Sequence, residues 1–281
     1  MTPFGARLRE AMDAFGPLCV GIDPHPSLLH AWGLDDDAGG LERFSRTAIE
    51  ALAGRVAAVK PQSAFFERFG SRGVAVLERV IGDLAGTGTL CIVDAKRGDI
   101  GSTMKAYADA FCGNGSPLAG DAVTVSPYLG LESLRPVLDL AHLTGRGVFV
   151  LALTSNPGGP DVQHATSAAG GSVAEQVVKA VGAENAGAEP LGSVGLVVGA
   201  TVGDAVRRLG IDLAAANAPL LAPGLGVQGG GTADLRQVFA GALGNLLPSS
   251  SREVLAAGPD VAALREAAVR TAEHCARALT P

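Results

Sequence analysis

Short, nearly continuous apolar runs recur along the 281-residue chain, and each is followed by a segment of helical character. Their apolar residues do not alternate with polar ones, which is typical of strands buried on both faces of a parallel sheet. The segments between them, such as LERFSRTAIEALAG and GVAVLERVIGDLAG, are amphipathic. The runs cover residues 18–22, 56–60, 89–93, 122–126, 147–153, 194–198, 219–222 and 245–248.

Eight strands that alternate with helices favour a closed (β/α)8 TIM barrel over an open doubly wound sheet. A barrel of this kind takes about 250 residues, so we expect residues 1–281 to form a single domain. The connection at residues 156–192 is unusually long. We predict that it begins as a loop, either an active-site lid or a plain insertion, and continues into a helix.

Composition and charge exclude several classes of function. Hydrophobic residues make up 47% of the chain, which excludes disorder, and a net charge of −6 without a Lys/Arg-rich run argues against nucleic acid. No apolar run approaches the length of a membrane span, and the first residues lack the apolar core of a signal peptide. The four cysteines are widely spaced, as expected for reduced thiols. We therefore expect a cytoplasmic protein with no membrane partner.

Polar side chains follow the apolar runs at the predicted carboxyl ends of the strands, where barrel enzymes have their active sites. The segment VDAKRGDIGST, residues 93–103, is the most informative. Asp94 and Lys96 are two residues apart and point to the same face, Asp99 follows in the turn, and Lys60 ends the preceding strand. Carboxylates on both sides are expected to keep Lys96 protonated, as a proton donor rather than a Schiff-base nucleophile. Taken alone, D-x-K also fits a surface salt bridge.

The glycine-rich stretch APGLGVQGGG, residues 222–231, is a second candidate site. Its backbone N–H groups could cradle a phosphate, as the corresponding loops of many barrels do, or it could be a plain flexible loop. The last strand ends in Ser-Ser-Ser-Arg, and the hydroxyls and the Arg252 guanidinium suit a phosphate dianion. A dinucleotide site is not indicated, because no acidic residue ends the next strand. The histidines lack metal-ligand spacing.

These segments resemble the orotidine 5'-phosphate decarboxylase family. VDAKRGDI matches the family signature and continues through Gly101, Ser102 and Thr103, while GIDP, VKPQSAFFE, VGLVVGAT and APGLGVQGG occur in the family's order. The resemblance covers roughly residues 18–255 and is closest to a longer bacterial subgroup, with TSNPGG and PSSSRE. It implies conversion of orotidine 5'-phosphate to uridine monophosphate (UMP) and carbon dioxide, with no metal and no other cofactor.

The resemblance also implies roles for single residues. Lys96 would deliver a proton to C6 of the pyrimidine, with Asp94 as its partner in the central pair. Lys60 would hydrogen-bond the ribose and steady Asp94, and Asp23 would also hold the ribose. Gln228 would grip the phosphate together with the arginine after the eighth strand, although short family members have Gly-Arg where this chain has Ser-Ser-Ser-Arg.

Two further residues are expected to act across a subunit boundary. The resemblance implies that Asp99 and Thr103 reach into a neighbouring subunit's site, so the active unit would be a homodimer with shared sites. Ser155 would meet the pyrimidine ring. Since the alignment slips by one residue there, Thr154 or Asn156 are alternatives for this contact.

Two other functions are compatible with parts of the pattern. The first is a sister activity on the same scaffold, a keto-gulonate-phosphate decarboxylase or hexulose-phosphate synthase, which shares D-x-K-x-x-D but uses magnesium. Arg97 and Gly98 within the motif, and the VKPQ strand, favour the orotidine branch. The second is a catalytically silent barrel that binds a nucleotide or sugar phosphate as a sensor. A buried ammonium between carboxylates argues against it.

Overall fold

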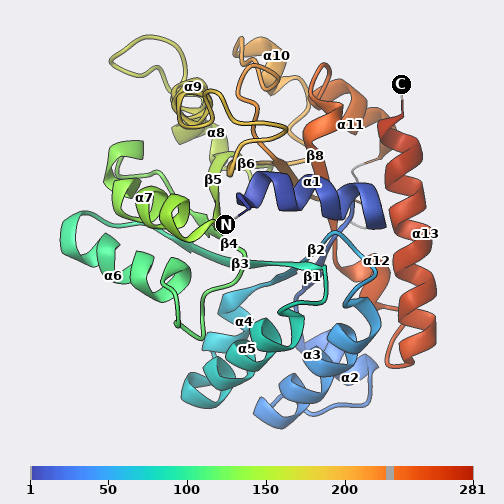
Figure 1. Ribbon diagram of the computed structural model, residues 1–281. Coiled ribbons are helices and arrows are strands. Elements are labelled where there is room, and N and C mark those ends of the chain that lie inside the picture. Colours follow the sequence, from blue (N-terminus) through green and yellow to red (C-terminus); the bar gives the residue numbers. More distant parts are fainter. Residues whose placement is uncertain (1, 226–230, 281) are drawn as a thin grey trace.

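The protein folds as a closed barrel of eight parallel strands, in a computed structural model that describes residues 2–225 and 231–280. Strands that follow one another in the chain are neighbours in the barrel, and β8 pairs with β1 to close it (Figure 1). The predicted (β/α)8 fold is confirmed, and every predicted apolar run overlaps a strand. The strands are β1 (Cys19–Ile22), β2 (Ala58–Pro61), β3 (Leu90–Arg97), β4 (Ala122–Val125), β5 (Gly147–Leu153), β6 (Val194–Val198), β7 (Leu220–Pro223) and β8 (Leu246–Ser250).

Helices surround the barrel on its outside, and α1 crosses one of its ends (Figure 1). They are α1 (Phe4–Phe15), α2 (Pro26–Ala31), α3 (Ala38–Leu52), α4 (Ser63–Glu67), α5 (Gly70–Leu84), α6 (Gly101–Cys112), α7 (Arg135–Thr144), α8 (Gly159–Gln163), α9 (Val173–Glu184), α10 (Ala205–Arg208), α11 (Thr232–Val238), α12 (Arg252–Leu255) and α13 (Val261–Leu279), with 3-10 helices η1 (Leu131–Leu134) and η3 (Leu243–Asn245). The long connection after β5 ends in the predicted helix, α9. Its loop also contains α8, which composition did not predict, with a proline in the first turn that favours helix initiation.

The inside of the barrel is filled by alternate residues of the strands, which point inward. Phe149 occupies the middle, where a Cβ atom on Gly195 would lie 2.5 Å from its ring. Phe4 of α1 meets Phe149 edge to face, with ring centroids 5.8 Å apart. Helix α1 therefore closes the amino-terminal end of the barrel. The other inward residues of this apolar cluster are Cys19, Ala58, Leu90, Ile92, Ala122, Val197, Leu221 and Leu247.

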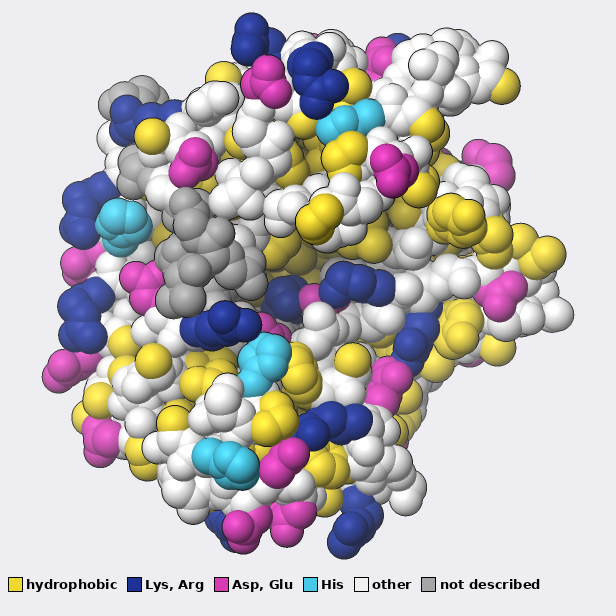
Figure 2. Space-filling model, turned by 180° about the vertical axis from the view of Figure 1, so that it is seen from behind, with side chains coloured by type: hydrophobic (Ala, Val, Ile, Leu, Met, Phe, Trp, Pro, Cys, Tyr) yellow, Lys and Arg dark blue, Asp and Glu magenta, His cyan; other side chains and the backbone are white. Residues whose placement is uncertain are grey.

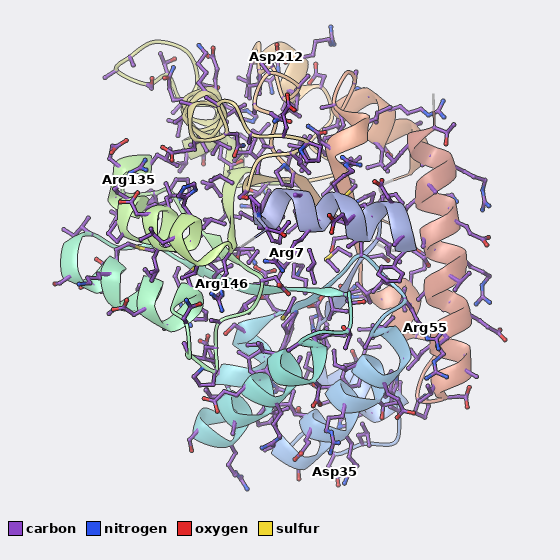
Figure 3. The ribbon with its side chains drawn as sticks, viewed as in Figure 1. Arg7, Asp35, Arg55, Arg135, Arg146 and Asp212 are labelled. Carbon is purple, nitrogen blue, oxygen red and sulfur yellow. The ribbon has the colours of Figure 1, made fainter. Side chains whose placement is uncertain are left out.

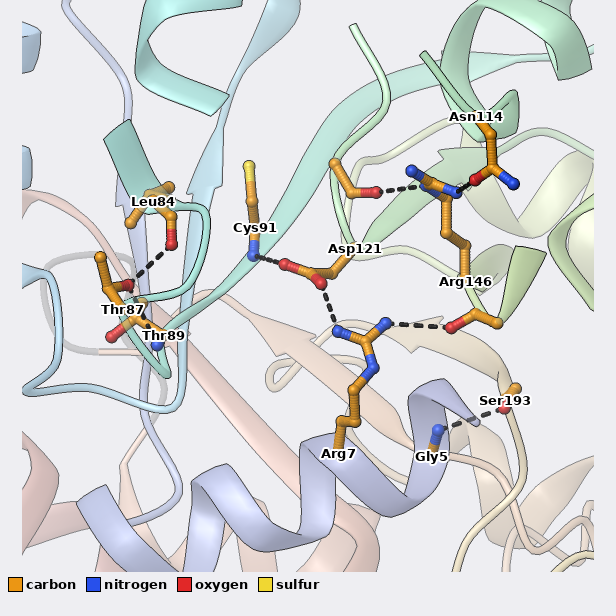
Figure 4. A network of polar contacts seen from close by, with 12 residues as sticks. Gly5, Arg7, Leu84, Thr87, Thr89, Cys91, Asn114, Asp121, Arg146 and Ser193 are labelled. Carbon is orange, nitrogen blue, oxygen red and sulfur yellow. Dashed lines mark hydrogen bonds and ion pairs between the residues drawn. The ribbon is translucent and has the colours of Figure 1, made fainter. Parts of the chain in front are cut away.

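A polar network ties α1 to the amino-terminal ends of β3 and β5 (Figure 4). Arg7 pairs with the carboxylate of Asp121 and donates to the carbonyl of Gly145 at 2.9 Å. Asp121 in turn accepts the backbone N–H of Cys91 at 2.8 Å. Arg146 lies nearby on the same side of the molecule as Arg7 (Figure 3). These contacts hold the closed end of the barrel together, whereas the candidate site lies at the opposite end.

All four cysteines are free and buried. Burial raises the pKa of the Cys19 thiol to about 12, so it stays protonated inside the barrel. Within residues 2–225 and 231–280, no helix has the length and apolar character needed to cross a membrane.

Candidate active site

A cavity of about 280 Å³ lies at the carboxyl ends of the strands. Figure 2 views the molecule from the side opposite α1 and shows a hollow near the centre of this face, with Lys/Arg and Asp/Glu side chains inside it. Five residues predicted from four separate segments of the sequence line this cavity. They are Asp23 after β1, Lys60 on β2, Asp94 and Lys96 on β3, and Arg252 after β8.

The centre of the cavity is an ion-pair cluster built around Asp94. The Nζ atom of Lys60 lies 2.7 Å from Oδ2 of Asp94, and the Nζ atom of Lys96 lies 2.6 Å from Oδ1. Lys60 and Asp94 are both 6% exposed, whereas the side chain of Lys96 is 43% exposed. One carboxylate thus joins a buried ammonium group to one that faces the cavity, as the D-x-K spacing and the preceding strand predict.

The electrostatics of this cluster keep Lys60 and Asp94 charged. Burial by itself raises the pKa of Asp94, but the ammonium groups of Lys60 and Lys96 outweigh burial and hold that pKa well below its usual range. Burial by itself lowers the pKa of Lys60, but the carboxylates of Asp94 and Asp23 outweigh it and hold that pKa above its usual range. The site therefore holds the ionised carboxylate of Asp94 between the side-chain nitrogens of Lys60 and Lys96.

The backbone at Lys96 has an unusual conformation. Its φ angle is +47°, in the left-handed region that a residue other than glycine seldom adopts. The register between β3 and β4 shifts between Val93 and Arg97, so the end of β3 departs from a regular strand. The N–H of Lys96 donates to Oγ1 of Thr124 at 2.9 Å. Sequence reasoning missed Thr124; its signal was a lone hydroxyl within the apolar run AVTV.

The neighbourhood of β1 contains an unsatisfied acceptor. The Oδ1 atom of Asp23 is buried and has no hydrogen-bond partner among the described residues. Gly21 makes room for this region, because a Cβ atom there would lie 2.0 Å from Oγ of Ser251. His25 also lines the cavity and contacts the ring of Phe65 edge to face, at 4.4 Å between centroids. No sequence motif indicated His25 as a site residue.

The end of the cavity next to β8 is lined by Ser249, Ser251, Arg252 and Glu253. The structure thus brings Arg252 and two of the three predicted hydroxyl groups to the same cavity. Glu253 adds a carboxylate that the sequence analysis did not anticipate. Gln228, the other predicted phosphate contact, lies outside the described residues.

Three predicted residues do not line this cavity. Asp99 and Thr103 lie beyond the end of β3, where Oδ1 of Asp99 accepts the N–H of Ile100 at 2.8 Å and Thr103 is exposed on α6. Ser155 is exposed after β5. Its neighbours Thr154 and Asn156 are hydrogen-bonded to each other at 2.6 Å.

The chain is similar to proteins of one known family. The sequence model of the orotidine 5'-phosphate decarboxylase / HUMPS family matches residues 16–267. The chain belongs to this family. A relative from Salinispora arenicola, named orotidine 5'-phosphate decarboxylase, is 64% identical over 280 residues, which is 100% of this chain and 99% of the relative. A relative of the same name from Streptomyces coelicolor is 61% identical over 281 residues, again covering 100% and 99%.

Solved structures of orotidine 5'-phosphate decarboxylases are also similar to this chain. The crystal structure of a candidate orotidine 5'-phosphate decarboxylase from Streptomyces avermitilis superposes with a TM-score of 0.95 at 60% identity, covering 99% of this chain and 96% of that one. The structure of Leishmania donovani OMP decarboxylase gives a TM-score of 0.75 at 32% identity, covering 99% of both chains. The resemblance found in the sequence motifs is therefore confirmed at the level of the family.

Proposed function

We propose that this chain is an orotidine 5'-phosphate decarboxylase that works without a metal and uses Lys96 as the proton donor. The observation that carries the proposal is the Lys60–Asp94–Lys96 cluster at the open end of the barrel, with contacts of 2.7 and 2.6 Å. The full-length relatives at more than 60% identity carry the name of the same enzyme.

In the proposed reaction the bond between C6 of the pyrimidine and the carboxylate breaks, and its electron pair stays on C6. Carbon dioxide leaves, and C6 takes a proton from Nζ of Lys96, which is reprotonated from solvent. The ammonium group stands where negative charge develops, so it stabilises the transition state by a preorganised charge. Asp94 orients this ammonium through a contact of 2.6 Å. The negative charge of Asp94 also repels the substrate carboxylate beside it, and this repulsion is relieved as carbon dioxide leaves.

Substrate binding is proposed to use the polar groups around the cluster. The buried, unsatisfied Oδ1 of Asp23 supports a role as acceptor for a ribose hydroxyl, because an unpaired buried acceptor is otherwise destabilising. Arg252 and the serines beside it are suited to the phosphate, and we assign Gln228 the same role from its motif. For the base contact we favour Ser155, since Thr154 already exchanges hydrogen bonds with Gln163 at 2.6 and 2.9 Å.

The chain is proposed to form a homodimer in which Asp99 and Thr103 of each subunit reach into the other subunit's site. Three large apolar side chains next to them support it: Ile100, Tyr128 and Leu129 are 61%, 77% and 53% exposed. The loops that carry them lie side by side, because the N–H of Ser126 donates to the carbonyl of Arg97 at 2.8 Å. An apolar patch beside the site is suited to a second copy of the chain, which would bring its own Asp99 towards this cavity.

The hydrogen bonds of the Asp94 carboxylate support a reaction that requires no metal. Both oxygens of Asp94 accept hydrogen bonds, from Lys60, Lys96 and Thr124, and two of these donors are cations that would repel a metal ion. This favours the orotidine branch over the magnesium-dependent sister activity. We further propose that the chain forms a single domain and works in the cytoplasm, where its four free thiols would stay reduced.

The test is an ultraviolet assay of the purified protein with orotidine 5'-phosphate in the presence of EDTA. We expect the orotate absorbance to fall while UMP forms. Turnover of a sugar phosphate only, and only after magnesium is added, would replace the proposal with the sister activity. Tight binding of UMP without turnover of either substrate would leave a silent binding barrel.

A further inference from the structure

Thr124 interrupts the apolar strand β4 with a hydroxyl group. Its neighbours Val123 and Val125 point outward into the helix-facing core, whereas Ala122 and Thr124 point into the barrel. Ala122 belongs to the inner apolar cluster, and Thr124 lies one layer higher, at the floor of the cavity. Thr124 is 1% exposed. A hydroxyl buried this deeply needs hydrogen-bond partners, since leaving it unpaired would destabilise the fold.

The two partners of this hydroxyl belong to the proposed catalytic cluster. Oγ1 of Thr124 accepts the backbone N–H of Lys96 at 2.9 Å and donates to Oδ1 of Asp94 at 2.8 Å. The direction of the second bond is fixed, because the carboxylate of Asp94 is ionised and can only accept. The same carboxylate oxygen accepts from Nζ of Lys96 at 2.6 Å. Thr124 thus contacts both the backbone of Lys96 and the Asp94 carboxylate that accepts a hydrogen bond from the Lys96 ammonium group.

The Thr124 side chain bonds the Lys96 N–H at a point where the regular pairing of β3 with β4 is interrupted. The β3–β4 register shifts between Val93 and Arg97, and within that gap Lys96 has a φ angle of +47°. A residue with a side chain in this region is strained by about 1–2 kcal/mol, so surrounding contacts must hold it there. The hydrogen bond from Lys96 to Thr124 supplies such a contact from the neighbouring strand.

We propose that Thr124 is a positioning residue whose hydroxyl fixes Lys96 and Asp94 relative to each other. This inference rests on the proposed decarboxylase function. Thr124 acts through its two partners and takes no part in proton transfer itself. Loss of the hydroxyl would leave the strand and its packing intact but would free the Lys96 backbone and one edge of the Asp94 carboxylate. Small displacements of a proton donor from its reactive geometry reduce the rate far more than they weaken substrate binding.

The test compares Thr124→Val, which keeps the shape and removes the hydroxyl, with Thr124→Ser, which keeps the hydroxyl. We expect T124V to lower kcat on the order of 100-fold with little change in KM, and T124S to retain most of the activity. Thr89→Val is the matched control, because Thr89 is also buried and donates to the carbonyl of Val56 at 2.7 Å, away from the cavity. T89V should lower stability but leave kcat unchanged.

A second readout does not depend on turnover. Hydrogen–deuterium exchange of the Lys96 amide should be about tenfold faster in T124V than in the wild type, because a hydrogen bond of ordinary net strength is lost. It should stay slow in T124S. The positioning role would be overturned if T124V and the wild type had equal exchange or equal kcat. It would also be overturned if T124S were as slow as T124V, or if the loss of activity were confined to KM. A wild-type protein that is inactive on orotidine 5'-phosphate refutes the proposed function instead, and the exchange experiment still decides the role of Thr124 in holding Lys96.

Discussion

Replacement of Asp94 by Asn tests whether the buried ion pair with Lys60 supports the fold as well as the reaction. The amide has nearly the volume of the carboxylate, so no cavity forms, but Lys60 is left as a buried cation with a side chain only 8% exposed. Breaking a buried pair in this way destabilises a protein by about 3–5 kcal/mol. At about 2 °C per kcal/mol for a chain of this size, we expect the Tm to fall by about 6–10 °C. Differential scanning calorimetry at pH 7 measures this.

Lys96→Met is the matched control for that measurement. It removes the other ammonium that contacts Asp94, but this side chain is 43% exposed and solvent screens its charge. Its loss should therefore change stability by about 0–1 kcal/mol, which is at most about 2 °C. A D94N protein as stable as the wild type, or a Lys96→Met protein that loses as much stability as D94N, would refute the reasoning.

The pH dependence gives a second check with a defined sign. In the folded wild type the pKa of Asp94 is held well below its usual range, chiefly by Lys60 and Lys96 against the effect of burial. An unfolded aspartate titrates near pH 3.9, so below about pH 5 the unfolded chain takes up a proton that the folded protein does not. The stability contributed by this carboxylate is complete above that pH and is lost as the pH falls. The Tm difference between wild type and D94N should shrink between pH 5 and pH 3, and a constant difference would contradict the assignment.

Three further experiments address the remaining roles. Lys96→Ala should abolish turnover of orotidine 5'-phosphate while the circular dichroism spectrum stays that of the wild type; near-normal activity would contradict its role as proton donor. Mixing Asp94→Asn with Asp99→Asn subunits should restore some activity, because each mixed dimer would contain one intact shared site; no recovery would count against sharing. Arg252→Ala should weaken binding of UMP in titration calorimetry by about 10–100-fold, as expected for a lost charge-assisted hydrogen bond, whereas Arg9→Ala at the closed end should bind normally.

The barrel could be predicted because its strands are buried on both faces and so have continuous apolar sequences. Lys60, Asp94 and Lys96 could be predicted as a cluster because each follows such a run, and parallel strands end at a common edge. The sequence could not indicate that Lys96 adopts a left-handed φ angle, because that depends on the register between β3 and β4. For the same reason Thr124 was missed, since its partners come from another strand.

Residues on loops were harder to assign. The resemblance indicates a role for Asp99, but in a single chain this residue lies in the turn after β3, away from the cavity. Its proposed role requires a second subunit, which the sequence of one chain does not place. Ser155 could not be separated from Thr154 by motif alone, and the proposal of Ser155 for the base contact depends on the hydrogen bonds between Thr154 and Gln163. Helix α8 lies in a segment whose glycine and proline content indicated a loop.

The closure of the barrel by Phe4 and Phe149 limits the routes by which molecules can reach and leave the cavity. With the amino-terminal end filled by side chains, the cavity formed by residues 2–225 and 231–280 opens at the carboxyl ends of the strands. Arrival and departure therefore use the same passage, and a nucleotide that remains after carbon dioxide has escaped blocks the next one. Product and substrate must then exclude each other from the free protein, so product that accumulates slows the reaction by competing with the substrate for the cavity.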